Sequence, residues 1–235
     1  MHKDSHVHIG WFKEKYYDFE PVFEAVFTSG KINEIAYSST TSCVKDVKYN
    51  IIVKEIEAVQ KKYSSVAIPL FWFVPDYINQ EVKINVTMRE LKYGGFKLHP
   101  LGNNWNFEKD TRQMKVLHEI FDYADKNKYP ILIHTGENGV DRPNRFERFF
   151  GEYKNARIIL AHCRPADETI EMMIKYGNVF CDTSFATPKR IEQIKNAGFT
   201  ERIIFGTDFP ITHFYYGAKK GISLEEQYLE DVKDL

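Results

Sequence analysis

The chain has 235 residues, of which 43% are hydrophobic and 28% are charged, and its formal net charge at pH 7 is −1. These values are ordinary for a globular protein and allow one large core. A nearly neutral chain suggests no polyanionic partner, so we expect no nucleic acid. No apolar run approaches the roughly 20 residues of a membrane span, so we expect no membrane partner.

The cysteines indicate a compartment. Cys43, Cys163 and Cys181 are widely spaced, unlike a disulfide framework, and fit a reducing cytosol. The first predicted strand begins within a few residues of Met1, which leaves no room for a signal peptide. We therefore expect a cytoplasmic protein that acts on a small molecule, with assembly into a homo-oligomer left open.

Eight predicted strands alternate with helices along the chain. The strands cover residues 1–10, 34–39, 66–74, 95–100, 130–136, 156–163, 178–183 and 202–208. The clearest helices cover residues 18–30, 46–62, 111–126, 165–177 and 187–198, a weaker one covers 79–91, and a terminal one begins at 223. The run at 66–74 is continuously apolar, which is typical of a buried parallel strand.

Several residues predict where the helices begin and end. Asp18 is the expected N-cap of the first helix and Gly30 its end. Ser223 and Glu226 form a capping box for the last helix. Ile174 is expected on the apolar face of the helix over 165–177.

This alternation predicts an α/β fold with a parallel sheet and crossover helices. Eight units of roughly 30 residues favour a (β/α)8 TIM barrel, formed as a single domain by residues 1–235. The alternative is an open doubly wound sheet. That fold favours a glycine-rich phosphate-binding turn after the first strand, and the sequence HIGWFKEK does not supply one.

The first ten residues, MHKDSHVHIG, carry a candidate metal motif. Asp4, His6 and His8 alternate with other residues, so in a strand they share one face, and two imidazoles can reach one ion. The alternative is that the histidines lie in a disordered terminal tail. Asp4 is expected either to support the ligands or to form a salt bridge at the base of the barrel.

Further polar residues stand where other predicted strands end. They are Lys97, His99, His134, His162 and Asp208. Each one alone has an ordinary explanation, such as a core histidine or a helix cap. Together they are hard to explain by packing, because buried polar groups are costly unless paired. Functional groups of barrels gather at the carboxyl ends of strands, where these residues would meet.

The motifs DSHVHI, GFKLHP, ILIHTG, LAHC and FGTDFP resemble the strand-end motifs of the amidohydrolase superfamily, in the branch called amidohydrolase-2. The resemblance runs from the first predicted strand to the eighth. It implies a metal-dependent (β/α)8 hydrolase. Carried over position by position, it implies four metal ligands, namely His6, His8, His134 and Asp208. It also implies that His162 is either a second ligand site or an acid/base and substrate-polarising group.

Three imidazoles and one carboxylate suit a divalent metal, for which we expect Zn²⁺, with one position left for water. The metal would lower the pKa of that water toward neutrality. Asp208 would accept the water's proton and pass it to the leaving group. His162 would hydrogen-bond the developing oxyanion.

Lys97 decides between one ion and two. Many relatives use a carboxylated lysine on strand four to bridge two metals, whereas an unmodified ammonium has no lone pair to offer. His99 crowds the same strand face, Pro100 follows it, and the four predicted ligands suffice for one ion without Lys97. We therefore favour one ion, with Lys97 as a candidate catalytic cation that holds a substrate carboxylate or pairs with an acid.

Substrate contacts are predicted from position alone. His99 is a candidate for binding substrate or metal. Arg164 follows the LAHC motif and either pairs with a substrate carboxylate or forms a surface ion pair. Trp11, Trp105 and Phe185 fall in predicted loops, where they form a pocket wall or pack locally.

Three functions remain open on these grounds. The first is hydrolysis of a small amide, ester or lactone by a metal-activated water. The second is decarboxylation of a small unsaturated or aromatic acid on the same scaffold. The third is a binding barrel without catalysis, which the complete ligand set argues against. DNA-cleaving relatives carry a glutamate on strand four, where this chain has Lys97.

Overall fold

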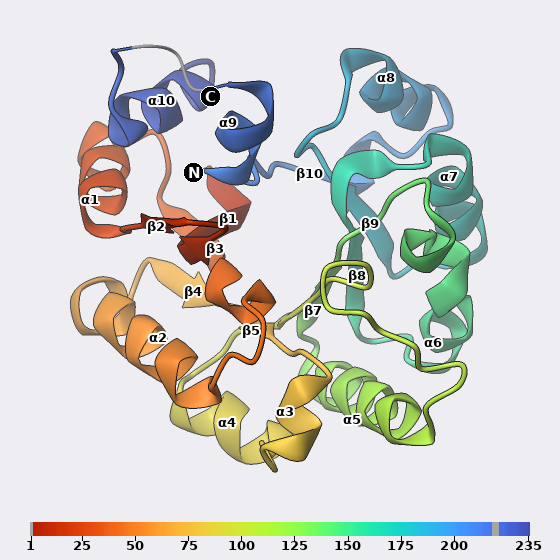
Figure 1. Ribbon diagram of the computed structural model, residues 1–235. Helices are drawn as coiled ribbons and strands as arrows, with labels where there is room; N and C mark the ends of the chain where they lie inside the picture. Colours follow the sequence, from red (N-terminus) through yellow and green to blue (C-terminus); the bar gives the residue numbers. More distant parts are fainter. Residues whose placement is uncertain (1, 218–220) are drawn as a thin grey trace. The chain divides into compact units, whose positions relative to one another are not determined.

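The computed structural model describes residues 2–217 and 221–235. It forms two compact units, each with its own sheet (Figure 1). The first unit combines Met1–Pro69 with Phe205–Leu235, and the second is Leu70–Ile204. Both ends of the chain therefore belong to the same unit.

The first unit holds a sheet with the strand order β2-β1-β3-β4, in which β2 is antiparallel to β1 and the other pairs are parallel. Its strands are β1 (Lys3–Phe12), β2 (Lys15–Tyr17), β3 (Glu34–Ser39) and β4 (Ala67–Pro69). Its helices are α1 (Glu20–Ser29), α2 (Tyr49–Tyr63), α9 (Ile211–Tyr216) and α10 (Leu224–Asp231). Helices α1 and α10 pack side by side (Figure 1).

The second unit holds a parallel sheet with the strand order β10-β9-β8-β7-β6-β5. Its strands are β5 (Phe71–Trp72), β6 (Phe96–Leu98), β7 (Pro130–Ile133), β8 (Arg157–Leu160), β9 (Val179–Asp182) and β10 (Ile203–Ile204). Its helices are α3 (Asp76–Asn79), α4 (Ile84–Glu90), α5 (Thr111–Asn127), α6 (Glu147–Glu152), α7 (Ala166–Lys175) and α8 (Pro188–Asn196). Parallel pairing brings the carboxyl ends of these strands to one edge.

Much of the predicted secondary structure is confirmed. Strand β3 covers the predicted residues, and Gly30 follows α1 with a φ of 68°, a left-handed conformation that glycine adopts without strain. Ser223 and Glu226 form the predicted capping box at the start of α10. These signals depend on neighbouring residues only, which is why the sequence reveals them.

The run predicted as one strand over 66–74 is two strands, β4 and β5. Pro69 has no N–H to donate to a ladder, and pairing changes partner there. Tyr37 on β3 lies in register with Pro69, whereas the amide of Phe71 donates to the carbonyl of Gly95 at 2.8 Å. The strand predicted over 202–208 is also shorter, because β10 ends at Ile204.

Three predicted helix features are wrong. The N-cap of α1 is Phe19, and the Asp18 carboxylate instead accepts from the amide of Glu20 at 3.1 Å. The helix over 79–91 is interrupted, since Glu81 has a φ of 54° between α3 and α4. Ile174 is 70% exposed, because α7 buries Met172 and Met173 on its inner face.

Within residues 2–217 and 221–235, none of the helices combines the length and apolarity that crossing a bilayer requires.

Candidate metal centre and polar cluster

The H-x-H motif lies on β1, which is almost wholly buried. His6 and His8 expose 1% and 5% of their surface, so the motif is part of the core and not a disordered tail. Because the two residues are two apart on a strand, their rings lie on one side, with centroids 5.0 Å apart. The alternation in the sequence therefore produces the expected pair of neighbouring imidazoles.

Asp208 lies beside this pair in the first unit. The segment 205–209 runs parallel to β1, since the amide of Asp208 donates to the carbonyl of His6 at 2.7 Å and Val7 bridges Phe209. The Nε2 atoms of His6 and His8 lie 3.4 and 2.8 Å from the same carboxylate oxygen, Oδ1 of Asp208. Three side chains from two distant parts of the chain thus converge.

Ser38 on β3 holds the other nitrogen of His8. The Nδ1 atom lies 3.3 Å from the Ser38 carbonyl oxygen and 3.0 Å from its Oγ. A carbonyl oxygen only accepts, so this contact favours a proton on Nδ1, whereas the Asp208 carboxylate 2.8 Å from Nε2 favours a proton there as well. A metal ion bound at Nε2 would replace that second proton. A histidine that binds metal commonly donates its second N–H to a carbonyl in this way.

Asp4 lies on β1, two residues before His6, and is fully buried. Its carboxylate accepts from the amide of His6 at 3.0 Å, from the Thr207 hydroxyl at 2.7 Å and from the Tyr228 hydroxyl at 2.7 Å. Burial raises the pKa of Asp4 to about 6, against the opposing effect of these hydrogen bonds. Asp4 therefore ties β1 to the segment that carries Asp208, and these partners are hydrogen-bond donors rather than the predicted salt-bridge cation.

The donor set of the first unit fits a divalent metal ion. His6, His8 and Asp208 each offer one ligand atom, and the three atoms lie within 4.8 Å of one another. Two imidazole nitrogens and a carboxylate oxygen are ligands that Zn²⁺ and similar first-row ions accept.

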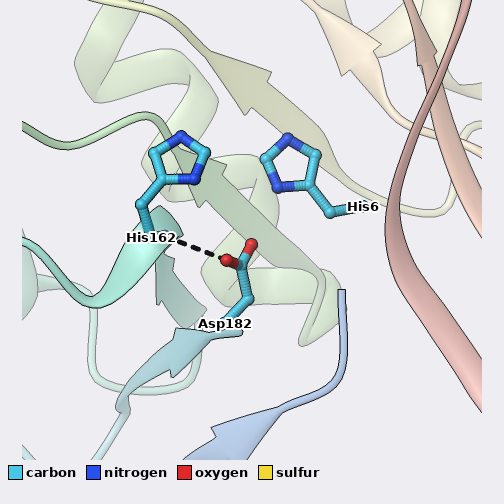
Figure 2. Close-up of side chains that lie close together, drawn as sticks. All are labelled: His6, His162 and Asp182. Carbon is cyan, nitrogen blue, oxygen red and sulfur yellow. Dashed lines mark hydrogen bonds between the residues drawn. The ribbon is translucent and has the colours of Figure 1, made fainter. Parts of the chain in front are cut away.

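A second polar cluster occupies the carboxyl ends of β7, β8 and β9. His134 Nδ1 lies 3.0 Å from His162 Nε2, and His162 Nδ1 lies 2.8 Å from Ser184 Oγ. The Asp182 carboxylate accepts from the amide of His162 at 2.9 Å (Figure 2) and from the Ser184 hydroxyl at 2.5 Å. His162 has a φ of 73°, so these bonds hold it in an unusual backbone conformation.

The hydrogen bonds assign the protons in this cluster. Ser184 Oγ donates to Asp182, so it accepts from His162 Nδ1, as does the Ser184 carbonyl at 3.1 Å. His162 then presents a lone pair at Nε2 and receives the Nδ1 proton of His134. The Nε2 atom of His134 consequently carries a lone pair, as a metal ligand or proton acceptor must.

His99 is held differently. Its ring stacks on that of His134, with centroids 3.8 Å apart, and on Trp72 at 5.9 Å. The amide of Gly102 donates to His99 Nδ1 at 3.0 Å, so neutral His99 carries its proton on Nε2. A ring nitrogen of His99 lies within 4.8 Å of ligand atoms of His134 and Asp141, as in a metal site. In this tautomer, however, Nε2 is a hydrogen-bond donor and has no lone pair for a metal.

Two cations complete the cluster. Lys97 is 1% exposed, with its ammonium 5.6 Å from the Trp72 ring centroid, and Arg164 donates to the Thr135 carbonyl at 2.8 Å. Arg164 is therefore partly buried and not a surface ion pair. The pKa of His134 lies well below its usual value, chiefly through burial, with the charges of His99, His162, Lys97 and Arg164 acting in the same direction.

The structure adds residues that the sequence did not single out. Asp182, Ser184 and Asp141 are buried polar residues in the second unit. Asp182 ends β9, so its position at a strand end was a signal that could have identified it. Asp141 lies in a long loop, where its carboxylate accepts from the amide of Leu101 at 2.9 Å, and no local pattern announces that contact.

The aromatic residues predicted for a pocket wall have separate positions. Trp105 is 3% exposed and packs against Phe73, so it belongs to the core of the second unit. Phe185 meets the His162 ring edge to face at 5.4 Å. Trp11 is 43% exposed and contacts Tyr16 across the turn between β1 and β2.

A comparison of the sequence with protein families decides the relationship. The profile described as Amidohydrolase matches residues 4–234, nearly the whole chain. The chain belongs to the amidohydrolase family. This is the amidohydrolase-2 branch of the amidohydrolase superfamily, whose metal-dependent enzymes include hydrolases, hydratases, isomerases and decarboxylases. A search of curated proteins found no match.

Solved structures show the fold of this amidohydrolase. It is similar to an uncharacterised TIM-barrel protein from Bordetella bronchiseptica, with a TM-score of 0.64 and 14% identity over 99% of this chain and 90% of that one. It is also similar to a protein described as amidohydrolase II, with a TM-score of 0.61 and 13% identity over 97% and 95% of the two chains.

A third similar structure is 4-oxalomesaconate hydratase from Rhodopseudomonas palustris, with a TM-score of 0.54 and 11% identity over 97% of this chain and 92% of that one. At such identities the likeness concerns the fold alone. The predicted α/β TIM barrel is confirmed, and the alternative of an open doubly wound sheet is wrong.

Proposed function

We propose that this amidohydrolase is a metal-dependent hydrolase of a small-molecule amide, ester or lactone. The observation that carries the proposal is the convergence of His6 and His8 Nε2 on Asp208 Oδ1 in a buried site. We propose these three residues as metal ligands. His134 remains a proposed further ligand on the grounds of the sequence, and its lone pair at Nε2 agrees with that role.

We propose a single ion, with Zn²⁺ as the first choice. The donor set of imidazole and carboxylate suits it, and a bound ion of this kind supplies an activated water near neutral pH. Lys97 would become a bridging ligand only after carboxylation of its amine, which requires the neutral form. We therefore propose that Lys97 remains an ammonium.

Proton transfer would depend on residues of the chain itself. Asp208 accepts a proton from the attacking water through its carboxylate, which is the basic group closest to the His6 and His8 nitrogens. His162 exchanges a proton through Nε2, because Ser184 holds its other nitrogen. We propose that His162 acts as the acid/base group or, once protonated, as the donor to the developing oxyanion.

We propose that His99, Lys97 and Arg164 bind the substrate. The Nε2–H of His99 is a donor. Lys97 lies in register with Leu132 on the neighbouring strand, and Arg164 donates to the carbonyl of Thr135, so both cations come from backbone positions beside that of His134. These groups would suit a substrate that carries a carboxylate. The same observation favours the second candidate, a decarboxylase of a small unsaturated or aromatic acid, because such a substrate is an anion.

The test begins with metal analysis of the purified protein, before and after chelation and reloading with Zn²⁺ in bicarbonate buffer. We expect one ion per chain and an unmodified Lys97. A panel of amides, esters, lactones and carboxylic acids then separates the two reactions, since a hydrolase releases a new carboxylic acid or alcohol whereas a decarboxylase releases CO₂.

Specific outcomes would contradict the proposal. Two ions bridged by a carboxylated Lys97 would refute the single-ion site and make His162 a ligand. His6→Ala and His8→Ala proteins that bind metal and turn over substrate like the unaltered protein would place the metal site elsewhere. CO₂ release without hydrolysis of any panel member would favour the decarboxylase.

A further inference from the structure

A hollow of 540 Å³ lies in the second unit, and its lining contains no histidine. It is bounded by α4, by the loop from α4 to β6, by α5 and by the residue before β7. The residues used below are Met88, Arg89, Lys92, Tyr93, Tyr123 and Tyr129. Tyr129 directly precedes β7, so the hollow is at the amino end of that strand, whereas His134 follows its carboxyl end.

Arg89 on the rim differs from the other arginines. Within the described ranges it is the one arginine whose guanidinium meets no carboxylate, carbonyl, side-chain amide, histidine or aromatic ring. The ammonium of Lys92 likewise has no hydrogen-bond or ion-pair partner among the described residues. The residues that line the hollow include no aspartate or glutamate. Two cations therefore border the hollow without protein carboxylates to neutralise them.

Aromatic rings form the walls. Tyr123 and Tyr129 have centroids 6.2 Å apart and planes inclined by 48°, so the two rings are splayed and not stacked. Their hydroxyls also have no hydrogen-bond partner among the described residues. Buried Met88 and Tyr93 lie behind them. Arg89 and Tyr123 both line the hollow, so the guanidinium and the ring belong to the same candidate site.

We propose that this hollow binds a small aromatic anion, meaning a planar ring that carries a carboxylate or a phosphate. The volume is within the usual range of small-molecule sites, which combine apolar walls with a few convergent polar groups. The tyrosine rings would hold the planar ring by offset or edge-to-face contact. Arg89 and Lys92 would bind the anionic group, for which the arginine fork is well suited.

The site is separate from the proposed catalytic residues. No step of the proposed reaction uses any of its lining residues, and binding is measurable without metal or turnover. Failure of the proposed hydrolase would therefore leave this inference intact, and the reverse also holds.

Calorimetric titration of the full chain with benzoate, adenosine 5′-monophosphate and inorganic phosphate tests the proposal. We expect one site per chain for at least one ring-bearing anion, and the better probe identifies the anionic group as carboxylate or phosphate. Phosphate alone should bind more weakly, because it lacks the ring. Diffraction from crystals soaked with 4-bromobenzoate or 8-bromoadenosine monophosphate should place bromine beside Tyr123.

Variants separate the contributions of charge and ring. Arg89→Ala with Lys92→Ala should weaken the better probe on the order of 10²-fold, since two charge-assisted contacts are lost. Arg112→Ala with Lys115→Ala on α5 removes the same charge outside the lining and should change affinity by no more than about twofold. Tyr123→Leu should weaken the ring-bearing probe and leave phosphate unchanged.

The proposal is overturned if neither ring-bearing probe binds at up to about 10 mM, a limit that corresponds to negligible affinity. It is also overturned if both double variants weaken binding equally, since the effect would then be general charge. Phosphate binding as tight as that of the aromatic anions would refute the role of the tyrosine rings.

Discussion

The two units hold their histidines in different surroundings. In the first, the His6 and His8 nitrogens face a carboxylate oxygen of Asp208, an arrangement that attracts a cation. In the second, His134 and His162 are hydrogen-bonded to each other, Lys97 lies in register with Leu132, and Arg164 donates to the carbonyl of Thr135. The same side chain therefore meets an anion in one unit, whereas in the other it meets a second imidazole near two cations.

The difference does not arise at Nδ1, which has similar partners in both units. A serine contacts Nδ1 of both His8 and His162, and in both cases its carbonyl favours a proton on that nitrogen. What lies beyond Nε2 then decides the chemistry, namely a carboxylate for His8 and an imidazole for His162. Predictions that compare these surroundings are given below in order of expected effect.

Removing the charge of Asp208 should have the largest effect. Asp208→Asn keeps the shape of the side chain but removes its negative charge. We expect metal affinity to fall by about 10²–10³-fold, which is one ligand's share of the total binding free energy. Competition with a chelator of known affinity measures this. Glu55→Gln is the control, because Glu55 is a buried acid of the same unit whose carboxylate accepts from Ser39 and Thr41. Equal loss in both proteins would contradict the assignment.

His162→Asn should retain most of the metal and lower the rate on the order of 10²-fold, as expected for an acid/base or oxyanion group. Asparagine tolerates the left-handed backbone at this position, so misfolding is not expected. Ser184→Ala should have a smaller effect, since the Ser184 carbonyl still accepts from Nδ1. Normal activity of His162→Asn with normal metal content would make His162 structural.

Tyr228→Phe should destabilise the first unit without changing its ligands. It removes the hydroxyl that donates to the buried carboxylate of Asp4, and we expect a loss of about 1.5–3 kcal/mol in the free energy of unfolding. Urea denaturation measures the change. Tyr129→Phe removes a hydroxyl that has no partner among the described residues and should cost less than about 0.5 kcal/mol. Similar losses in both proteins would argue against a role for the Asp4 bond.

The smallest effect concerns pH. Burial raises the pKa of Glu55 above its ordinary value of 4.5, while bonds from Ser39 and Thr41 oppose the shift. As pH rises above 4.5, the unfolded chain loses this proton first, so the contribution of Glu55 to stability falls until pH passes the raised pKa. Relative to the unaltered protein, Glu55→Gln should therefore gain stability as pH rises through this window, measured by melting temperature. A constant difference would contradict the raised pKa.

Parts of the fold that depend on neighbouring residues were predictable. The alternation at His6 and His8, the glycine that ends α1 and the capping box at Ser223 are local patterns, and each appears as expected. The break at Pro69 was less evident, because a continuous apolar run conceals a change of pairing partner. The exposure of Ile174 depends on which face of α7 meets the sheet, which periodicity alone did not resolve.

The candidate site shows the same division. The sequence singled out residues at strand ends, and the structure brings His6 and His8 together with Asp208, about 200 positions away along the chain. The sequence did not single out Ser184, whose hydroxyl and carbonyl oxygens both accept from Nδ1 of His162. A backbone carbonyl is available at every residue, so no residue type marks the one that binds a histidine.

By itself, the sequence determined the alternation of strands and helices, the barrel and the pair of histidines on one face of β1. These follow from the period of side chains along a strand or helix and from residues that begin or end helices, all of which act over a few positions. Only the tertiary structure decided which nitrogen of each histidine carries its proton. That choice depends on the atom that faces each ring, such as the Ser184 hydroxyl for His162 or the Gly102 amide for His99, and packing places those atoms.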